Sequence, residues 1–212
     1  MTDPARPPAT LPLFPIRGCI LLPGEALPLN VFEPRYLNML DDAMAAEGWL
    51  GIIQPRESGP SERPDLQPVG CAGRVASFKE TEDGRYLIVL EGVSRFRLAG
   101  EGDAPTPYRV AKVDYKPFEH DADARPLGAA DDHAGFHTLL RRFFDYAGLK
   151  ADWDSIEQAP ATLVADKVAM AAPFDAAAKQ ALLEAEDSRT RLKLLTAMMS
   201  EALDPSRPGG AA

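Results

Sequence analysis

The spacing of apolar residues changes near residue 119, and this change limits the folds open to the chain. Before it, apolar residues form short runs bounded by proline and glycine, which is typical of strands and turns. After it, apolar residues recur three and four positions apart, the spacing of one helix face. The clearest helical stripe is Phe136, Leu139, Leu140, Phe143 and Phe144. The pattern therefore predicts an α+β protein with a β-rich part followed by a helical part.

Composition divides the chain into four segments. The ends, 1–9 and 204–212, are rich in proline, glycine and alanine and are predicted to be disordered tails. Between them we expect a β-barrel subdomain over 10–118 and a helical subdomain over 119–203. The boundary is expected between about residues 117 and 131, where prolines and acidic residues gather.

Turn residues divide the β-rich part. The prolines at 23 and 28 predict short edge strands and turns rather than long central strands. Pro34 suits the first position of a helix that Gly48 ends, with Tyr36, Leu37, Leu40 and Met44 at roughly helical spacing. The Asp-Gly pair at 83–84 predicts a hairpin.

The second arm of that hairpin carries two further expectations. The near-continuous apolar run 86–90 predicts a strand buried on both faces. Gly92 predicts a bulge, and a positive φ there would make a substitution costly.

The helical part is expected to hold five helices. Asp152 or Asp154 suits the start of the second, and Asp187 or Ser188 suits the cap of the last, because short polar side chains accept from free N–H groups. The predicted helices cover 131–147, a segment from about 152, 161–171, 175–184 and 187–203.

The net charge of −9 and the pI of about 4.9 do not favour nucleic acid, whose binding needs a surplus of Lys and Arg. Cys19 and Cys71 lie among apolar or small residues and are expected to be small buried hydrophobes rather than a disulfide. The first residues lack the apolar core of a signal peptide, and no apolar run approaches the ~20 residues that cross a bilayer. We therefore expect a cytoplasmic protein without a membrane partner.

Motifs that carry catalysis are missing from the sequence. It has no phosphate-binding loop of the G-x-x-x-x-G-K-[ST] type and no dinucleotide-binding G-x-G-x-x-G motif. It also lacks the G-x-S-x-G motif of serine hydrolases and a paired Cys-x-x-Cys. We predict that the chain is no enzyme and needs no cofactor. The only weak metal candidates are His133 and His137, four residues apart on a predicted helix, with acidic residues nearby. The same residues are equally expected in a solvent-exposed acidic loop that leads into the first turn of a helix, without any metal.

Six segments resemble the N-terminal domain of Lon protease, in the same order along the chain. They cover residues 10–118 well, whereas the helical part is similar only in general character. The segments are LPLFPIR at 11–17, LLPGE at 21–25, PLNVFEPRY at 28–36, GIIQP at 51–55, VGCAGRV at 69–75 and LEGVSRFRL at 90–98.

This resemblance implies a PUA-like β pseudo-barrel followed by a helical bundle. It further implies a stand-alone member of the family without ATPase or peptidase domains. The predicted function is a non-catalytic module that binds peptides or unfolded protein segments. It would act as an adaptor in proteolysis or quality control, with a protease or chaperone as partner.

Two other functions stay open from the sequence: an RNA-binding PUA-like protein, and a metal-dependent or small-molecule-binding protein that uses the His133/His137 region. For the leading function we expect a groove near 23–36 and the 56–68 loop. The substrate-binding candidates are Pro23, Phe32, Glu33, Arg35 and Tyr36, although packing would explain most of them equally.

Overall fold

The structure is a computed structural model that describes residues 7–56, 63–123 and 134–204. Its contacts divide the chain into two compact units, Met1–Ala124 and Arg125–Ala212, which are described separately. Before this division, Lys116–Asp123 forms a 3-10 helix, η1, that contacts strand β5 of the first unit. Both expected tails lie almost wholly outside the described residues.

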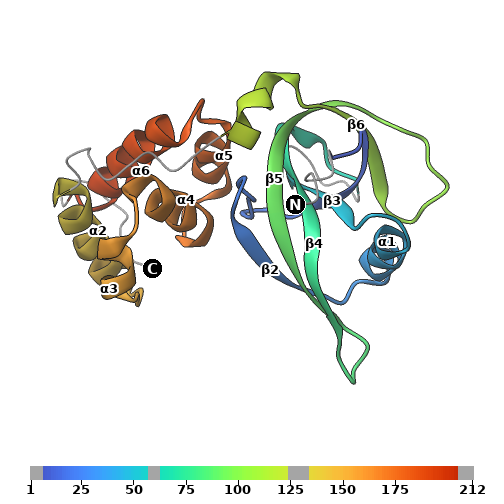
Figure 1. Ribbon diagram of the computed structural model, residues 1–212, viewed down its shortest axis with the longest axis horizontal. Coiled ribbons are helices and arrows are strands. Elements are labelled where there is room, and N and C mark those ends of the chain that lie inside the picture. Colours follow the sequence, from blue (N-terminus) through green and yellow to red (C-terminus); the bar gives the residue numbers. More distant parts are fainter. Residues whose placement is uncertain (1–6, 57–62, 124–133, 205–212) are drawn as a thin grey trace. The chain divides into compact units, whose positions relative to one another are not determined.

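Six strands of the first unit form one mixed sheet that closes on itself (Figure 1). The order is β2-β5-β4-β3-β1-β6, and β6 pairs again with β5; only β1 and β3 run parallel. Strand β5 pairs with β2 along its first half and with β6 along its second. The strands are β1 (Thr10–Pro15), β2 (Ala26–Val31), β3 (Trp49–Pro55), β4 (Leu66–Glu80), β5 (Tyr86–Glu101) and β6 (Arg109–Asp114).

Glycines make room for the largest side chain inside this barrel. Phe96 is fully buried, and it belongs to a core cluster with Leu13, Ile53 and Ala72. A Cβ on Gly70 would lie 2.6 Å from Phe96 Cζ and 2.6 Å from the carbonyl oxygen of Ile52. The VGCAG segment therefore serves packing, because only glycine leaves space for the ring.

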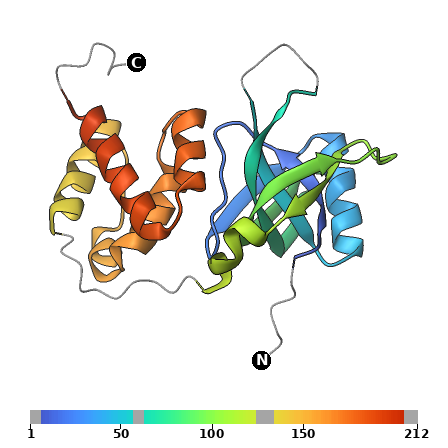
Figure 2. The same cartoon turned by 90° about the horizontal axis from the view of Figure 1, so that it is seen from above.

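Helix α1 (Pro34–Ala45) lies beside the barrel (Figure 2). Pro34 opens it, as predicted, and Gly48, with φ 76°, follows its end. Its buried face is Tyr36, Met39, Leu40 and Ala43, spaced i, i+3, i+4 and i+7. Met44 lies in the helix, as predicted, but one residue beyond the buried face, and its side chain is 45% exposed.

The predicted hairpin is confirmed, but its burial was misjudged. Gly84 adopts φ 75°, and its N–H donates to the Thr81 carbonyl across the turn. In strand β5, Ile88 is buried whereas Leu87 is 41% exposed, so the strand is not buried on both faces. Leu87 lies between β2 and β4, paired with Asn30 and Lys79, and its side chain is on the face of these strands opposite to the buried Ile88.

Two other expectations for the first unit need correction. Residues 19–23 form no strand; they belong to a loop whose Ile20, Leu21 and Leu22 are buried. Cys71 is fully buried as expected, but Cys19 is partly exposed. Neither cysteine forms a disulfide.

The second unit contains five helices among its described residues, close to the predicted bounds. Asp152, Asp175 and Asp187 cap three of them by accepting from the backbone N–H three residues later. The helices are α2 (Ala134–Ala147), α3 (Trp153–Gln158), α4 (Ala161–Ala171), α5 (Ala176–Glu184) and α6 (Ser188–Ala202).

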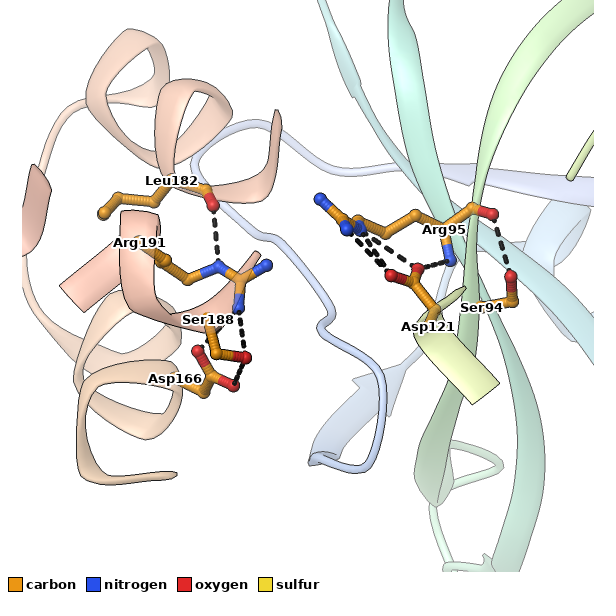
Figure 3. Close-up of polar contacts among 7 residues, drawn as sticks. All are labelled: Ser94, Arg95, Asp121, Asp166, Leu182, Ser188 and Arg191. Atoms are coloured by element: carbon orange, nitrogen blue, oxygen red, sulfur yellow. Dashed lines mark hydrogen bonds and ion pairs between the residues drawn. The ribbon is translucent and has the colours of Figure 1, made fainter. Parts of the chain in front are cut away.

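Each unit also holds a buried ion pair (Figure 3). In the first, Arg95 Nη2 lies 2.7 Å from Asp121 Oδ1, and the Arg95 backbone N–H also donates to Asp121. In the second, Arg191 Nη1 lies 2.7 Å from Asp166 Oδ1, and Arg191 Nε donates to the Leu182 carbonyl. These pairs join η1 to β5, and α6 to α4 and α5.

Candidate polypeptide-binding surface

Large apolar side chains are exposed mainly on the first unit. Phe32 is the most exposed of them among the described residues, at 64%. Such residues favour a contact surface when they lie close together. The full set is Phe32, Met44, Phe78, Leu87 and Tyr146, of which only Tyr146 belongs to the second unit.

Strand register places Phe32 and Leu87 on one face. Asn30 pairs with Leu87, and the next residue, Val31, is buried on the opposite face. Phe32 lies one residue beyond the end of β2, and continuing the alternation of the strand places its side chain on the side of Leu87. Pro28 and its partner Val89 extend this face along the two strands. We call Pro28, Phe32, Leu87 and Val89 the outer β2–β5 face.

Two tyrosines tie helix α1 to the segments around it. The Tyr86 hydroxyl donates to Asp41 at 2.9 Å, and the Tyr108 hydroxyl donates to Asp42 at 2.6 Å. The hydrogen bond to Asp41 raises the pKa of Tyr86, and burial together with Asp42 raises the pKa of Tyr108 to about 12. Both phenols therefore stay protonated donors at neutral pH, and they hold the helix that directly follows Phe32.

The five residues predicted for binding lie in different environments. Glu33 and Arg35 form an exposed ion pair at 2.8 Å. Glu33 occupies the N-cap position of α1, but its side chain makes no cap hydrogen bond. Tyr36 is 6% exposed, with its ring 4.4 Å from that of Phe14, and burial raises its pKa. Pro23 is half-buried. Only Phe32 offers a large exposed apolar group.

The described ends of the 56–68 segment lie away from Phe32. Residues 57–62 lie outside the described residues, and 66–68 belong to β4. Arg56 donates to the Asp65 carbonyl at 2.7 Å, at the end of β4 that begins with Leu66. Phe32 lies near Tyr86, which pairs with Glu80 at the other end of β4. The two predicted parts of the groove are thus separated by the length of this strand.

The described residues around His133 and His137 give little support for a metal site. His133 lies outside the described residues, and His137 is half-buried on α2. Asp121 is engaged by Arg95. Within the part of the chain that is described, no group of three or more His, Cys, Asp or Glu could hold a metal. An apolar pocket of about 310 Å³ lies between α2, α3 and α4, but His137 is not among its lining residues.

Sequence reasoning missed Leu87 and Val89 in this surface. Their run of five apolar residues resembles a strand covered on both sides, and no local signal separates that case from an overhanging hairpin. Both residues lie on the outer face of the paired strands β2 and β5, where Leu87 is 41% exposed.

A closed mixed sheet followed by a helical unit defines an α+β domain. The family model of the ATP-dependent protease La (LON) substrate-binding domain matches residues 10–201. The chain belongs to this family. The predicted α+β fold, a β-barrel followed by helices, is confirmed.

Relatives and solved structures agree with this assignment. Lon protease 2 of Sorangium cellulosum is 30% identical over 97% of this chain, and Lon protease of Escherichia coli is 26% identical over 92%. The chain spans about a quarter of these relatives, at 26% and 25% of their length. A Lon N-terminal domain protein from Xanthomonas campestris matches with a TM-score of 0.62 at 25% identity, covering 89% of this chain and 97% of that one.

A second solved structure supports the fold alone. The N-terminal domain of Mycobacterium avium complex Lon protease matches with a TM-score of 0.63 at 21% identity, covering 92% of this chain and all of that one. No helix within residues 7–56, 63–123 and 134–204 is long and apolar enough to cross a membrane.

Proposed function

We propose that the first unit binds apolar segments of peptides and unfolded proteins on the outer β2–β5 face. One observation carries this proposal: Phe32, 64% exposed, shares a face with the exposed Leu87 next to an ordered helix start. Exposed aromatic residues on a rigid scaffold provide contact area at a low cost in conformational entropy. Membership in a substrate-binding family supports the same role.

The charge of the chain fits such a ligand. At a net charge of −9, the protein repels nucleic acid and acidic polymers but not neutral or basic apolar segments. A small patch without a deep pocket gives weak contact, so we expect dissociation constants of roughly micromolar or poorer. Weak and broad binding suits recognition of many unfolded chains.

We further propose that recognition is the whole contribution of this chain. In this role it would be a cytoplasmic adaptor that presents bound segments to a protease or chaperone and carries out no chemistry itself. The family match over residues 10–201 supports this, since it is to a substrate-binding domain. Copurification with a protease or chaperone in the presence of an unfolded substrate, weakened by Phe32→Ser, would support the adaptor role.

The test of the binding proposal is the affinity of the full chain for a permanently unfolded protein, such as reduced, carboxymethylated α-lactalbumin, measured by fluorescence anisotropy. Phe32→Ser should weaken binding about tenfold, because it removes the central apolar contact. Leu87→Ser should weaken it by a smaller factor.

Two matched variants control for general loss of apolar surface. Met44→Ser and Tyr146→Ser each remove an exposed apolar side chain of similar exposure outside the outer β2–β5 face. Both should leave affinity unchanged. Equal effects of all four variants, or tighter binding to single-stranded RNA than to the unfolded protein, would refute the proposal.

A further inference from the structure

We propose that the bound segment adds to the sheet as an extra strand along the open edge of β2. This inference rests on the proposed function and specifies its mode of binding. Strand β2 ends the sheet order and pairs only with β5 among the described residues. A strand with one neighbour leaves half of its backbone N–H and C=O groups without a sheet partner, and an extended backbone complements that pattern.

The register identifies which groups face the open edge. The Gly92 N–H donates to the Glu25 carbonyl at 2.9 Å, directly before the paired residues Ala26 and Glu91. Hydrogen-bonded pairs of an antiparallel ladder recur at every second residue. Leu27, Leu29 and Val31 therefore direct their backbone groups to β5. Ala26, Pro28 and Asn30 direct theirs to the open edge.

The position of the proline agrees with this assignment. Pro28 has no N–H, so it fits only where the ladder to β5 needs no donor from it. It also shapes the edge: Ala26 and Asn30 each present an N–H and a C=O, whereas Pro28 between them presents a C=O alone. All three residues are exposed.

The residues with open backbone groups direct their side chains to the same outer face as Phe32 and Leu87. The side chains of Ala26, Pro28 and Asn30 lie on the outer face with Leu87 and Phe32, because alternation couples direction and face. An added antiparallel strand would place on this face the side chains of the residues that bond to β2. The substrate class is therefore an extended segment with apolar residues at alternate positions.

Acidic side chains at the border of the surface indicate the preferred charge of the segment. Glu91 pairs with Ala26 at one end of the edge and is exposed. Glu33 lies at the other end, beside Arg35. The charge of Glu33 is offset by Arg35, so Glu91 and the net charge of −9 are what favour segments whose flanking residues are neutral or basic.

The first test uses two forms of one peptide, alternating Val and Thr with a Lys at each end. One form is N-methylated at every Val and the other at every Thr. Strand addition predicts that one form loses at least tenfold in affinity for the full chain while the other stays within about twofold of the unmodified peptide. If the form methylated at Val loses affinity, the peptide strand adds antiparallel to β2. If the form methylated at Thr loses affinity, it adds parallel. Equal behaviour of the two forms would overturn the proposal.

The second test alters the open edge of strand β2 in the protein. Pro28→Ala restores an N–H that faces the open edge, so affinity for the unmodified peptide should rise about threefold to tenfold. Asn30→Pro removes an N–H from the same edge and should lower it by a similar factor. Neither N–H takes part in the β2–β5 ladder, so the unfolding midpoints of both variants should stay close to that of the parent.

The outcomes separate this inference from the proposed function. If Phe32→Ser weakens binding but Pro28→Ala leaves affinity unchanged, side chains alone make the contact and strand addition is wrong. If the unmodified peptide and unfolded proteins all fail to bind, both proposals are wrong. A gain with Pro28→Ala together with alternating N-methyl effects supports strand addition.

Discussion

At the scale of single residues, Gly92 lies where strand β5 meets the loop that precedes β2. The Gly92 N–H donates to the Glu25 carbonyl, and its own carbonyl accepts from Gly24 at 2.8 Å. A Cβ on Gly92 would lie 2.1 Å from the Leu22 carbonyl oxygen. A bulge follows directly, since the pairs Gly73–Gly92 and Ala72–Ser94 leave Val93 unpaired. The predicted bulge is confirmed, whereas φ is not positive; close backbone approach is the reason for glycine here.

Gly92→Val should therefore destabilise the first unit strongly. The new side chain forces the loop carrying Leu22 away from β5, which costs about 3 kcal/mol of unfolding free energy and lowers the melting temperature by roughly 6–12 °C. Thermal unfolding followed by circular dichroism measures this. Gly102→Val is the matched control, because a Cβ there meets nothing closer than 3.9 Å. Equal melting of the two variants would contradict the explanation.

The buried ion pair between Arg95 and Asp121 also contributes to stability at the scale of single residues. Both side chains are buried, at 4% and 8% exposure. Asp121→Asn should lower the unfolding free energy by about 3 kcal/mol, because it leaves the guanidinium buried without its counter-charge. Replacing both residues together, Arg95→Met with Asp121→Leu, should cost less than the single change. Urea denaturation measures both, and a double variant less stable than Asp121→Asn would contradict this reasoning.

At the scale of elements, local signals and long-range pairing differ in how far they predict structure. Helix α4 matches its predicted range, 161–171, since apolar spacing and a preceding proline are local features. The hairpin turn at Gly84 is equally local. The parallel pairing of β1 with β3 and the return of β6 to β5 join residues far apart in sequence, and no spacing encodes them. Leu87 pairs with Asn30, which is also far away in sequence, so the candidate surface on β2 and β5 was only partly predictable.

Helix α6 offers a test of a predicted cap. Asp187 accepts from the Thr190 N–H at 2.6 Å, and this bond lowers the pKa of the Asp187 carboxyl below its usual 3.8. A lowered folded-state pKa means that stability is present above the unfolded pKa and lost as pH falls through the folded one. Asp187→Ala should cost about 1 kcal/mol at pH 7. That difference should shrink below about pH 4.

Urea denaturation of the parent and Asp187→Ala at several pH values measures this difference. Asp187→Asn serves as the control, because the amide oxygen still caps the helix without a titrating group. A difference between parent and Asp187→Ala that stays constant from pH 7 to pH 2 would rule out the cap as its cause.

At the scale of the whole molecule, the two units each have the features of an independent folding unit. The first closes its sheet around Phe96, and the second packs its helices around Leu140 and Leu195; all three side chains are fully buried. Each unit also contains its own buried ion pair. Domains that bury separate cores commonly fold alone.

Fragments 1–124 and 125–212 should therefore each unfold in one cooperative transition, as measured by circular dichroism and by the dispersion of amide signals in NMR spectra. The first fragment should bind unfolded α-lactalbumin with the affinity of the full chain, because β2, the first half of β5 and Phe32 all belong to it. The second should not bind. Binding that follows the second fragment would move the recognition surface to the helices. A first fragment that is unfolded alone would show that its closed sheet needs the rest of the chain.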